Sequence, residues 1–153
     1  MHHPSPALPS EPDLSAPGLY LSRELAALEF NFRVLAMARD PAVPLLERLR
    51  YLSIVANNLD EFFEVRVAML KHHHAYGSAA PGPDGIPSGE LLARIRTRVL
   101  DLVAEQYAAW QEQISPQLDA EQVHILTRKR WTPRQRRWLQ GYFEHEVLPV
   151  LSP

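Results

Sequence analysis

The chain has 153 residues, which is the size of one domain and enough to bury a hydrophobic core. It holds no cysteine, so disulfides, cysteine nucleophiles and cysteine-based zinc sites are excluded, and its formal net charge of -2 gives no overall reason to expect a nucleic-acid partner. It shows neither a signal-peptide pattern nor an apolar stretch of about 18 residues, so we expect a cytoplasmic protein with no transmembrane segment.

Two segments are rich in residues that break regular structure. Residues 1–18 contain five prolines and no periodic apolar pattern, which predicts a disordered leader. Residues 76–89 combine three prolines with four glycines, which predicts a flexible loop. The remaining sequence has apolar residues at helical spacing, so the elements below are taken as helices in chain order.

The first predicted helix begins after Ser22, whose side chain can cap it, and Glu24 favours its positive end. It should run to about Arg39, because Asp40-Pro41 disfavours the α conformation at the residue before proline. The apolar positions along it are Leu25, Leu28, Phe32 and Leu35.

Two further helices are predicted before the loop. Pro44 can open one of them in its first turn, with an apolar stripe through Leu45, Leu49, Leu52 and Ala56. The next should run from about Leu59 to His74. Its apolar residues cover a wide face, so we expect it to be central in the bundle. They are Phe62, Phe63, Val65, Val67, Met69 and Leu70.

A long helix is predicted after the loop, with Ser88 as its cap and Pro116 as the residue that kinks or stops it. Its expected buried side is Leu92, Ile95, Val99, Leu102 or Val103, Gln106, Trp110 and Ile114. Residues 123–126 could form a short extended piece. Thr132-Pro133 should start a last helix, which Pro149 stops. The pattern predicts an all-α fold, an antiparallel helical bundle.

Asn57-Asn58 falls where the second predicted helix would end and the third begin. Asn58 suits a helix N-cap, with Glu61 reaching back to its amide as in a capping box. That interpretation needs no ligand. An Asn amide also offers two donors and one acceptor, which match the mixed edge of a purine. Spacing alone leaves open whether Asn57 or Asn58 caps and which of them points outward.

Three other clusters each have a structural and a functional interpretation. His72 to His74 point in different directions on a helix and make a poor ligand set, so we expect exposed residues at a helix end. Six basic residues between Arg128 and Arg137 surround Trp131 and Trp138, and indicate either a polyanion contact or a solvated face with both tryptophans packed inward. A further polar set has the composition of a catalytic set, but is expected to form buried or interfacial ion pairs that fix helix register. It consists of Arg23, Glu24, Glu29 and Asn31.

Six short motifs follow one another between Leu19 and Lys71. They are Arg23–Leu25, Leu28–Asn31, Arg33–Leu35, Pro44–Arg48, Asn57–Phe62 and Val65–Val67. With these motifs, the segment resembles the opening of the bacterial polyphosphate kinase family, of the type that passes through a phosphohistidine. Residues 138–153 resemble, more loosely, the start of that family's next domain. Ala26-Ala27 departs from a Ser-Trp pair that is usual in the family.

The resemblance implies an enzyme that moves the γ-phosphate of ATP to and from polyphosphate with Mg²⁺. It assigns an ATP contact to Asn58, near the adenine. It also implies that the phosphate-accepting histidine and the phosphate- and metal-binding residues lie in later domains, so we nominate no catalytic residue and no metal ligand in this chain.

The domain organisation expected from the resemblance is a disordered leader (1–18), the helical amino-terminal domain (19–128) and the truncated start of the middle domain (129–153). The expected partners are ATP, polyphosphate and the remaining domains of the parent enzyme, with a homo-oligomer as one compatible state. The alternative is a stand-alone helical module that binds protein partners or polyanions without catalysis.

Overall fold

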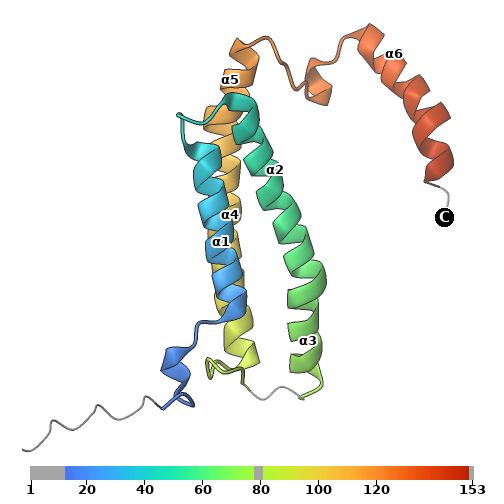
Figure 1. Ribbon diagram of the computed structural model, residues 1–153. Helices are drawn as coiled ribbons and strands as arrows, with labels where there is room; N and C mark the ends of the chain where they lie inside the picture. The colour runs from blue at the N-terminus through green and yellow to red at the C-terminus, as the bar shows by residue number, and fades with distance from the viewer. Residues whose placement is uncertain (1–12, 78–80, 152–153) are drawn as a thin grey trace, which may run out of the picture. The chain divides into compact units, whose positions relative to one another are not determined.

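The computed structural model describes residues 13–77 and 81–151, and all of their regular structure is helical (Figure 1). The chain divides into two compact units, the first ending at Ile114 and the second beginning at Ser115. The all-α class and the antiparallel bundle are confirmed, and residues 123–126, expected to form a short extended piece, have no regular secondary structure. Within the described ranges, no helix is long and apolar enough to cross a membrane.

The first unit contains three helical arms, joined by a short link after α1 and by the loop before α4. Its elements are η1 (Pro17–Leu19), α1 (Arg23–Arg39), α2 (Leu45–Glu61), the π-helical η2 (Phe62–Val67), α3 (Ala68–Ala75), α4 (Ser88–Ala108) and the π-helical η3 (Ala109–Ile114). α1 packs against both α2 and α4, and α3 packs against α4. The predicted leader falls largely on residues 1–12, which lie outside the described residues, as do residues 78–80 of the predicted loop.

The second unit contains shorter elements. They are α5 (Ser115–Ala120), η4 (Arg128–Arg130), α6 (Pro133–Tyr142), the π-helical η5 (Phe143–Val147) and η6 (Leu148–Val150). The predicted start at Thr132-Pro133 is confirmed, because Thr132 and Gln135 form a reciprocal capping box that satisfies free amides of the first turn. Pro116 lies inside α5, so the expectation that it might stop the helix is wrong. Immediately before it, η3 has π-helical spacing, a common adjustment where the regular ladder is interrupted.

The core of the first unit confirms the apolar spacing read from the sequence in part: Leu28, Leu35 and Ile95 are buried as expected, whereas only Leu52 of the predicted stripe on α2 is buried. Each fully buried aliphatic side chain contributes about 1.5 to 3 kcal/mol relative to an exposed one. These side chains come from all three arms, so burial ties them to one another. The buried apolar residues of this unit are Leu28, Leu35, Ala38, Leu52, Val55, Leu59, Phe62, Val67, Leu91, Ile95, Val99, Leu102, Ala109 and Ile114.

The predicted joint at Asn57-Asn58 is absent. α2 continues through both asparagines to Glu61, and η2 and α3 follow without a break, since Phe62 keeps a right-handed helical conformation with φ -59° and ψ -43°. Asn58 is therefore not an N-cap, and the capping box with Glu61 is wrong. Placing Asn in the interior of a helix costs less than about 1 kcal/mol relative to Ala. Burial of Val55 and Phe62 on either side outweighs it.

The expectation that the residues 59–74 form the central helix is also wrong. Phe62 and Val67 are buried, but Phe63, Val65 and Met69 are 43%, 53% and 54% exposed. α3 has no buried residue. The first unit offers packing partners to only one side of this arm, so half of its wide apolar face stays open.

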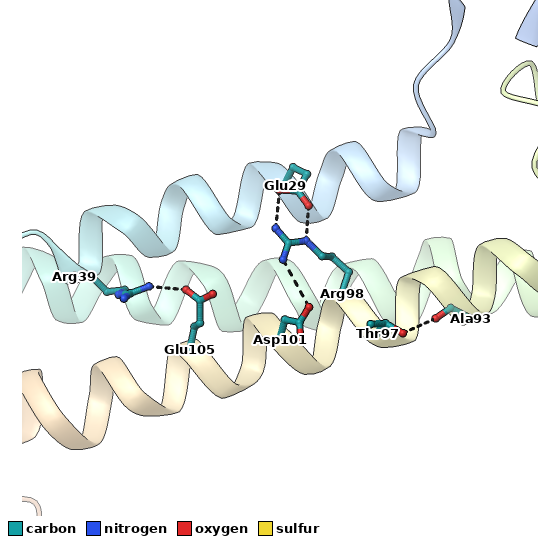
Figure 2. A network of polar contacts seen from close by, with 7 residues as sticks. All are labelled: Glu29, Arg39, Ala93, Thr97, Arg98, Asp101 and Glu105. Carbon is teal, nitrogen blue, oxygen red and sulfur yellow. Dashed lines mark hydrogen bonds and ion pairs between the residues drawn. The ribbon is translucent and has the colours of Figure 1, made fainter. Parts of the chain in front are cut away.

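Polar contacts between the arms fix their register. Arg98 of α4 donates two hydrogen bonds to the carboxylate of Glu29 on α1, from Nε at 2.5 Å and from Nη2 at 2.9 Å (Figure 2). Arg39 of α1 pairs with Glu105 further along α4. The predicted role of Glu29 in an inter-helix ion pair thus has a specific partner, whereas Arg23 pairs only with its neighbour Glu24, at 4.0 Å.

Candidate functional site

A groove of about 550 Å³ lies in the first unit, between the amino-terminal half of α1 and the arm formed by α2, η2 and α3. It contains the residue that the sequence singles out, Asn58, and most of the open apolar face of that arm. The residues that line it are Arg23, Glu24, Ala27, Phe30, Asn31, Asn58, Glu61, Phe62, Val65, Arg66, Met69, Leu70 and His73.

The long arm presents its groove residues on one continuous side. From Asn58 to His73 they follow one another at steps of three or four residues, apart from adjacent pairs, which is the spacing of a single helix face. This face exists only because the helix does not break at the asparagines. A joint at Asn58, as the sequence suggested, would have turned the later residues away from it.

Asn58 is held by a side chain from the facing helix. Its Nδ2 donates to Oδ1 of Asn31 at 2.8 Å. Asn31 is only 3% exposed, and Asn58 is half-buried. One N–H of the Asn58 amide is used by this bond, so a second N–H and the carbonyl oxygen remain for a ligand. One bond thus holds the amide in position, and one donor and one acceptor of the amide remain.

The rest of the groove combines apolar and charged groups. Phe30, Val65 and Met69 expose about half of their side chains, and could cover the faces of a planar ring. Arg23 and Arg66 are cationic groups on the same groove, able to attract an anionic part of a ligand. This chemistry suits a heteroaromatic ring with a polar edge and a negative tail. Among the described residues, no three His, Asp or Glu side chains come together to hold a metal ion.

Sequence reasoning missed the part played by Asn31. It grouped Asn31 with charged residues in register-fixing ion pairs, but the structure gives it a neutral partner in the groove. A signal was present, since Asn31 lies three residues after Leu28 and four before Leu35, on the buried stripe of α1. A polar side chain at a core position needs a hydrogen-bond partner there.

The other candidate residues lie elsewhere or act singly. Asn57 is exposed and does not line the groove. His72 to His74 are exposed at the end of α3, as predicted, although His73 also borders the groove and His74 Nδ1 lies 2.9 Å from Oγ of Ser88. In the second unit, Trp138 is 65% exposed, so the prediction that it packs inward is wrong.

The sequence of this chain was compared with family models and with known proteins, and both comparisons indicate the same family. The Polyphosphate kinase N-terminal domain family matches residues 20–126. A polyphosphate kinase of Xylella fastidiosa is 51% identical over 137 residues, which cover 90% of this chain and 20% of the relative. One of Pseudomonas syringae pv. tomato is 42% identical over 142 residues, covering 93% of this chain and 19% of the relative.

The polyphosphate kinase of Neisseria meningitidis serogroup B is 44% identical over 133 residues, covering 87% of this chain and 19% of the relative. The chain therefore spans about a fifth of the length of the curated relatives that it matches. No solved structure matches it.

Proposed function

Because the chain belongs to the polyphosphate kinase family, in which it matches the N-terminal domain, we propose that it is the amino-terminal part of an enzyme that transfers the γ-phosphate of ATP to polyphosphate. The observation that carries this proposal is the family match over residues 20–126. In this scheme the chain forms one wall of the ATP site. We place it in the cytoplasm, where ATP is available.

We assign the ATP contact to Asn58. An Asn amide pairs with adenine through two parallel hydrogen bonds, accepting from the exocyclic amine and donating to a ring nitrogen. The free N–H and carbonyl oxygen of Asn58 suit that edge, and the bond to Asn31 limits how far the amide can swing. Phe30 and Met69 offer apolar surface beside it for the faces of the base.

The contribution of this chain to catalysis is binding and orientation. Mg²⁺ neutralises the charge on the phosphates of ATP during phosphoryl transfer. The described residues do not provide a cluster that fits this ion, and we derive no step through it. The groove residues hold the base, so that the phosphates of ATP extend toward groups that other parts of the enzyme provide.

The test is steady-state kinetics of Asn58→Ala in a full-length polyphosphate kinase that carries this domain. One or two lost hydrogen bonds are worth about 0.5 to 1.5 kcal/mol each, so KM for ATP should rise by roughly 2- to 160-fold while kcat changes little. Asn57→Ala is the matched control, because this neighbour is exposed and outside the groove. An unchanged KM for ATP in Asn58→Ala would refute the assignment.

The family role has a separate test. The purified chain of 153 residues should make no polyphosphate from ATP, whereas a full-length enzyme containing it should do so. Clear turnover by the purified chain would overturn the proposal that it is a non-catalytic wall of the site. This outcome does not depend on where the adenine binds, so the two tests can fail independently.

A further inference from the structure

Residues 128–142 of the second unit, here called the basic segment, concentrate positive charge. They hold six of the 16 Lys and Arg residues of the chain and none of its 18 Asp and Glu residues. Since the whole chain has a net charge of -2, the rest of it is clearly acidic. The six basic residues are Arg128, Lys129, Arg130, Arg134, Arg136 and Arg137.

These cations are available to a ligand. All six are exposed, and none makes an ion pair with another described residue. In the first unit, by comparison, Arg39, Arg94 and Arg98 each pair with a carboxylate, although Arg33, Arg66 and Arg96 make no ion pair within the part of the chain that the structure describes. Like charges three or four residues apart destabilise a helix, and a bound polyanion removes that repulsion.

The local structure keeps the cations together. The capping box of Thr132 and Gln135 fixes the first turn of α6 directly after η4, which carries Arg128 to Arg130. Arg134 and Arg137 lie three residues apart on α6, and therefore on one side of it. Two separate elements thus contribute cations to a short stretch of surface, which suits a chain of phosphates better than a single one.

We propose that the basic segment is a binding site for linear polyphosphate, additional to the ATP groove. The choice of polyphosphate among linear polyanions rests on the proposed function. The aromatic residues favour it over RNA: Trp138 and Tyr142 stack on each other, with ring centres 5.4 Å apart and planes at 15°. Each ring therefore has one face fewer to offer to a base, and single-stranded nucleic-acid sites rely on aromatic faces that are open to successive bases.

The test measures binding of polyphosphate to the 153-residue chain by titration calorimetry at several salt concentrations. Phosphate contacts release counterions, so affinity should fall steeply as salt rises. The variant Arg134→Gln/Arg136→Gln/Arg137→Gln should bind at least about tenfold more weakly at low salt. The slope of log K against log salt should become shallower by roughly two, since each lost contact contributes about 0.7 for a single-stranded polyanion.

The matched control is Arg50→Gln/Arg94→Gln/Arg96→Gln, which removes three exposed charges from the first unit and should leave both quantities unchanged. Glutamine is nearly as good a helix former as arginine, and circular dichroism will check that α6 is retained. Equal losses in the two triple variants would refute the site, as would unchanged binding in the first of them. Tighter binding of a single-stranded RNA with the same number of phosphates would show a nucleic-acid site instead.

The assay contains no nucleotide, so its outcome is separate from that of the proposed ATP contact. If polyphosphate binds the basic segment while Asn58→Ala leaves KM for ATP unchanged, only the ATP assignment fails. If polyphosphate does not bind but KM for ATP rises in Asn58→Ala, only the basic segment loses its proposed ligand.

Discussion

Asn58, in the last turn of α2, donates a hydrogen bond of 2.8 Å to Asn31, a buried residue of α1 that lies 27 positions earlier in the chain. This bond joins two helices that both line the groove. Both amides are neutral, so the bond brings no charge into the core. The strength of the hydrogen bond can be measured as the interaction energy between Asn31 and Asn58 in a double-mutant cycle.

We predict that Asn31→Ala and Asn58→Ala are coupled in a double-mutant cycle of unfolding free energies. Removing Asn31 should cost about 1 to 3 kcal/mol, because it leaves the facing amide without its partner. The pair should show an interaction energy of about 0.5 to 1.5 kcal/mol in urea titrations. The control cycle of Asn31→Ala with Asn57→Ala should be additive, since Asn57 is exposed. Additivity in both cycles would argue against the bond.

Asn31 should also act on ATP binding through Asn58. We predict that Asn31→Ala in a full-length enzyme raises KM for ATP in the same direction as Asn58→Ala and leaves kcat little changed. The reason is that the Asn58 amide, once released, must be ordered again when ATP binds. In the variant Asn31→Ala/Asn58→Ala, KM should not rise much beyond that of Asn58→Ala alone. If the fold increase in KM of the double variant equals the product of the two single-variant increases, Asn31 affects ATP binding independently of Asn58.

The ion pair of Glu29 with Arg98 predicts a pH dependence of stability. Hydrogen bonds from the Arg98 guanidinium hold the pKa of Glu29 below its ordinary value of 4.5 (Figure 2). A depressed folded-state pKa stabilises the fold above the ordinary value, and this gain is lost as the pH falls through the lowered pKa. Both side chains are partly exposed, so the gain should be about 0.2 to 1 kcal/mol.

The comparison that isolates this effect is Glu29→Gln against the unmodified chain. The difference in unfolding free energy should be present at pH 7 and disappear below the lowered pKa, when Glu29 itself becomes neutral. Glu47→Gln, which affects a pair within a single helix, serves as the control. A difference that stays constant from pH 7 into the acid range would rule out the linkage.

Arg48 should be much more important to stability than its neighbour Arg50. Arg48 is 3% exposed and its Nε donates to the carbonyl oxygen of Ala38 at 2.8 Å, in the last turn of α1, where carbonyls lack helical partners. Its Nη2 donates to Oε1 of Gln113 at 3.0 Å. We predict that Arg48→Ala costs about 2 to 4 kcal/mol in thermal or urea unfolding. Arg50→Ala should cost less than about 0.5 kcal/mol, because Arg50 is exposed.

The sequence was sufficient for the elements whose ends are set by local chemistry. Ser22 accepts from the amide of Leu25 at 3.4 Å, and Thr132 forms its capping box, both where the sequence placed them. Caps of this kind act within one turn, so neighbouring residues specify them. Buried positions such as Leu28, Ile95 and Leu102 followed from helical spacing for the same reason.

Prediction from neighbouring residues failed where contacts between distant segments have a larger effect on the free energy. Asn57-Asn58 followed by acidic residues has the pattern of a helix start, but the gain from a cap is only about 1 kcal/mol. A continuous helix instead buries Leu59, Phe62 and Val67 against other arms and gives Asn58 a partner on α1. The exposure of Phe63 and Met69 could not be predicted for a similar reason. Helical spacing shows that apolar residues share one face of a helix, but it does not show whether another segment packs against that face.

Taken alone, the order of residues determined the helical class, the caps at Ser22 and Thr132 and the resemblance to polyphosphate kinases, because each depends on neighbours in the chain; the predicted cap at Ser88 is wrong, since Pro87 holds that position. Only the tertiary structure decided that Asn58 stands inside an unbroken helix, opposite Asn31 and at the edge of a groove. The physical reason is that burial and hydrogen bonding between helices exceed the small preference of an asparagine for a helix end, and these contacts depend on how distant segments come together.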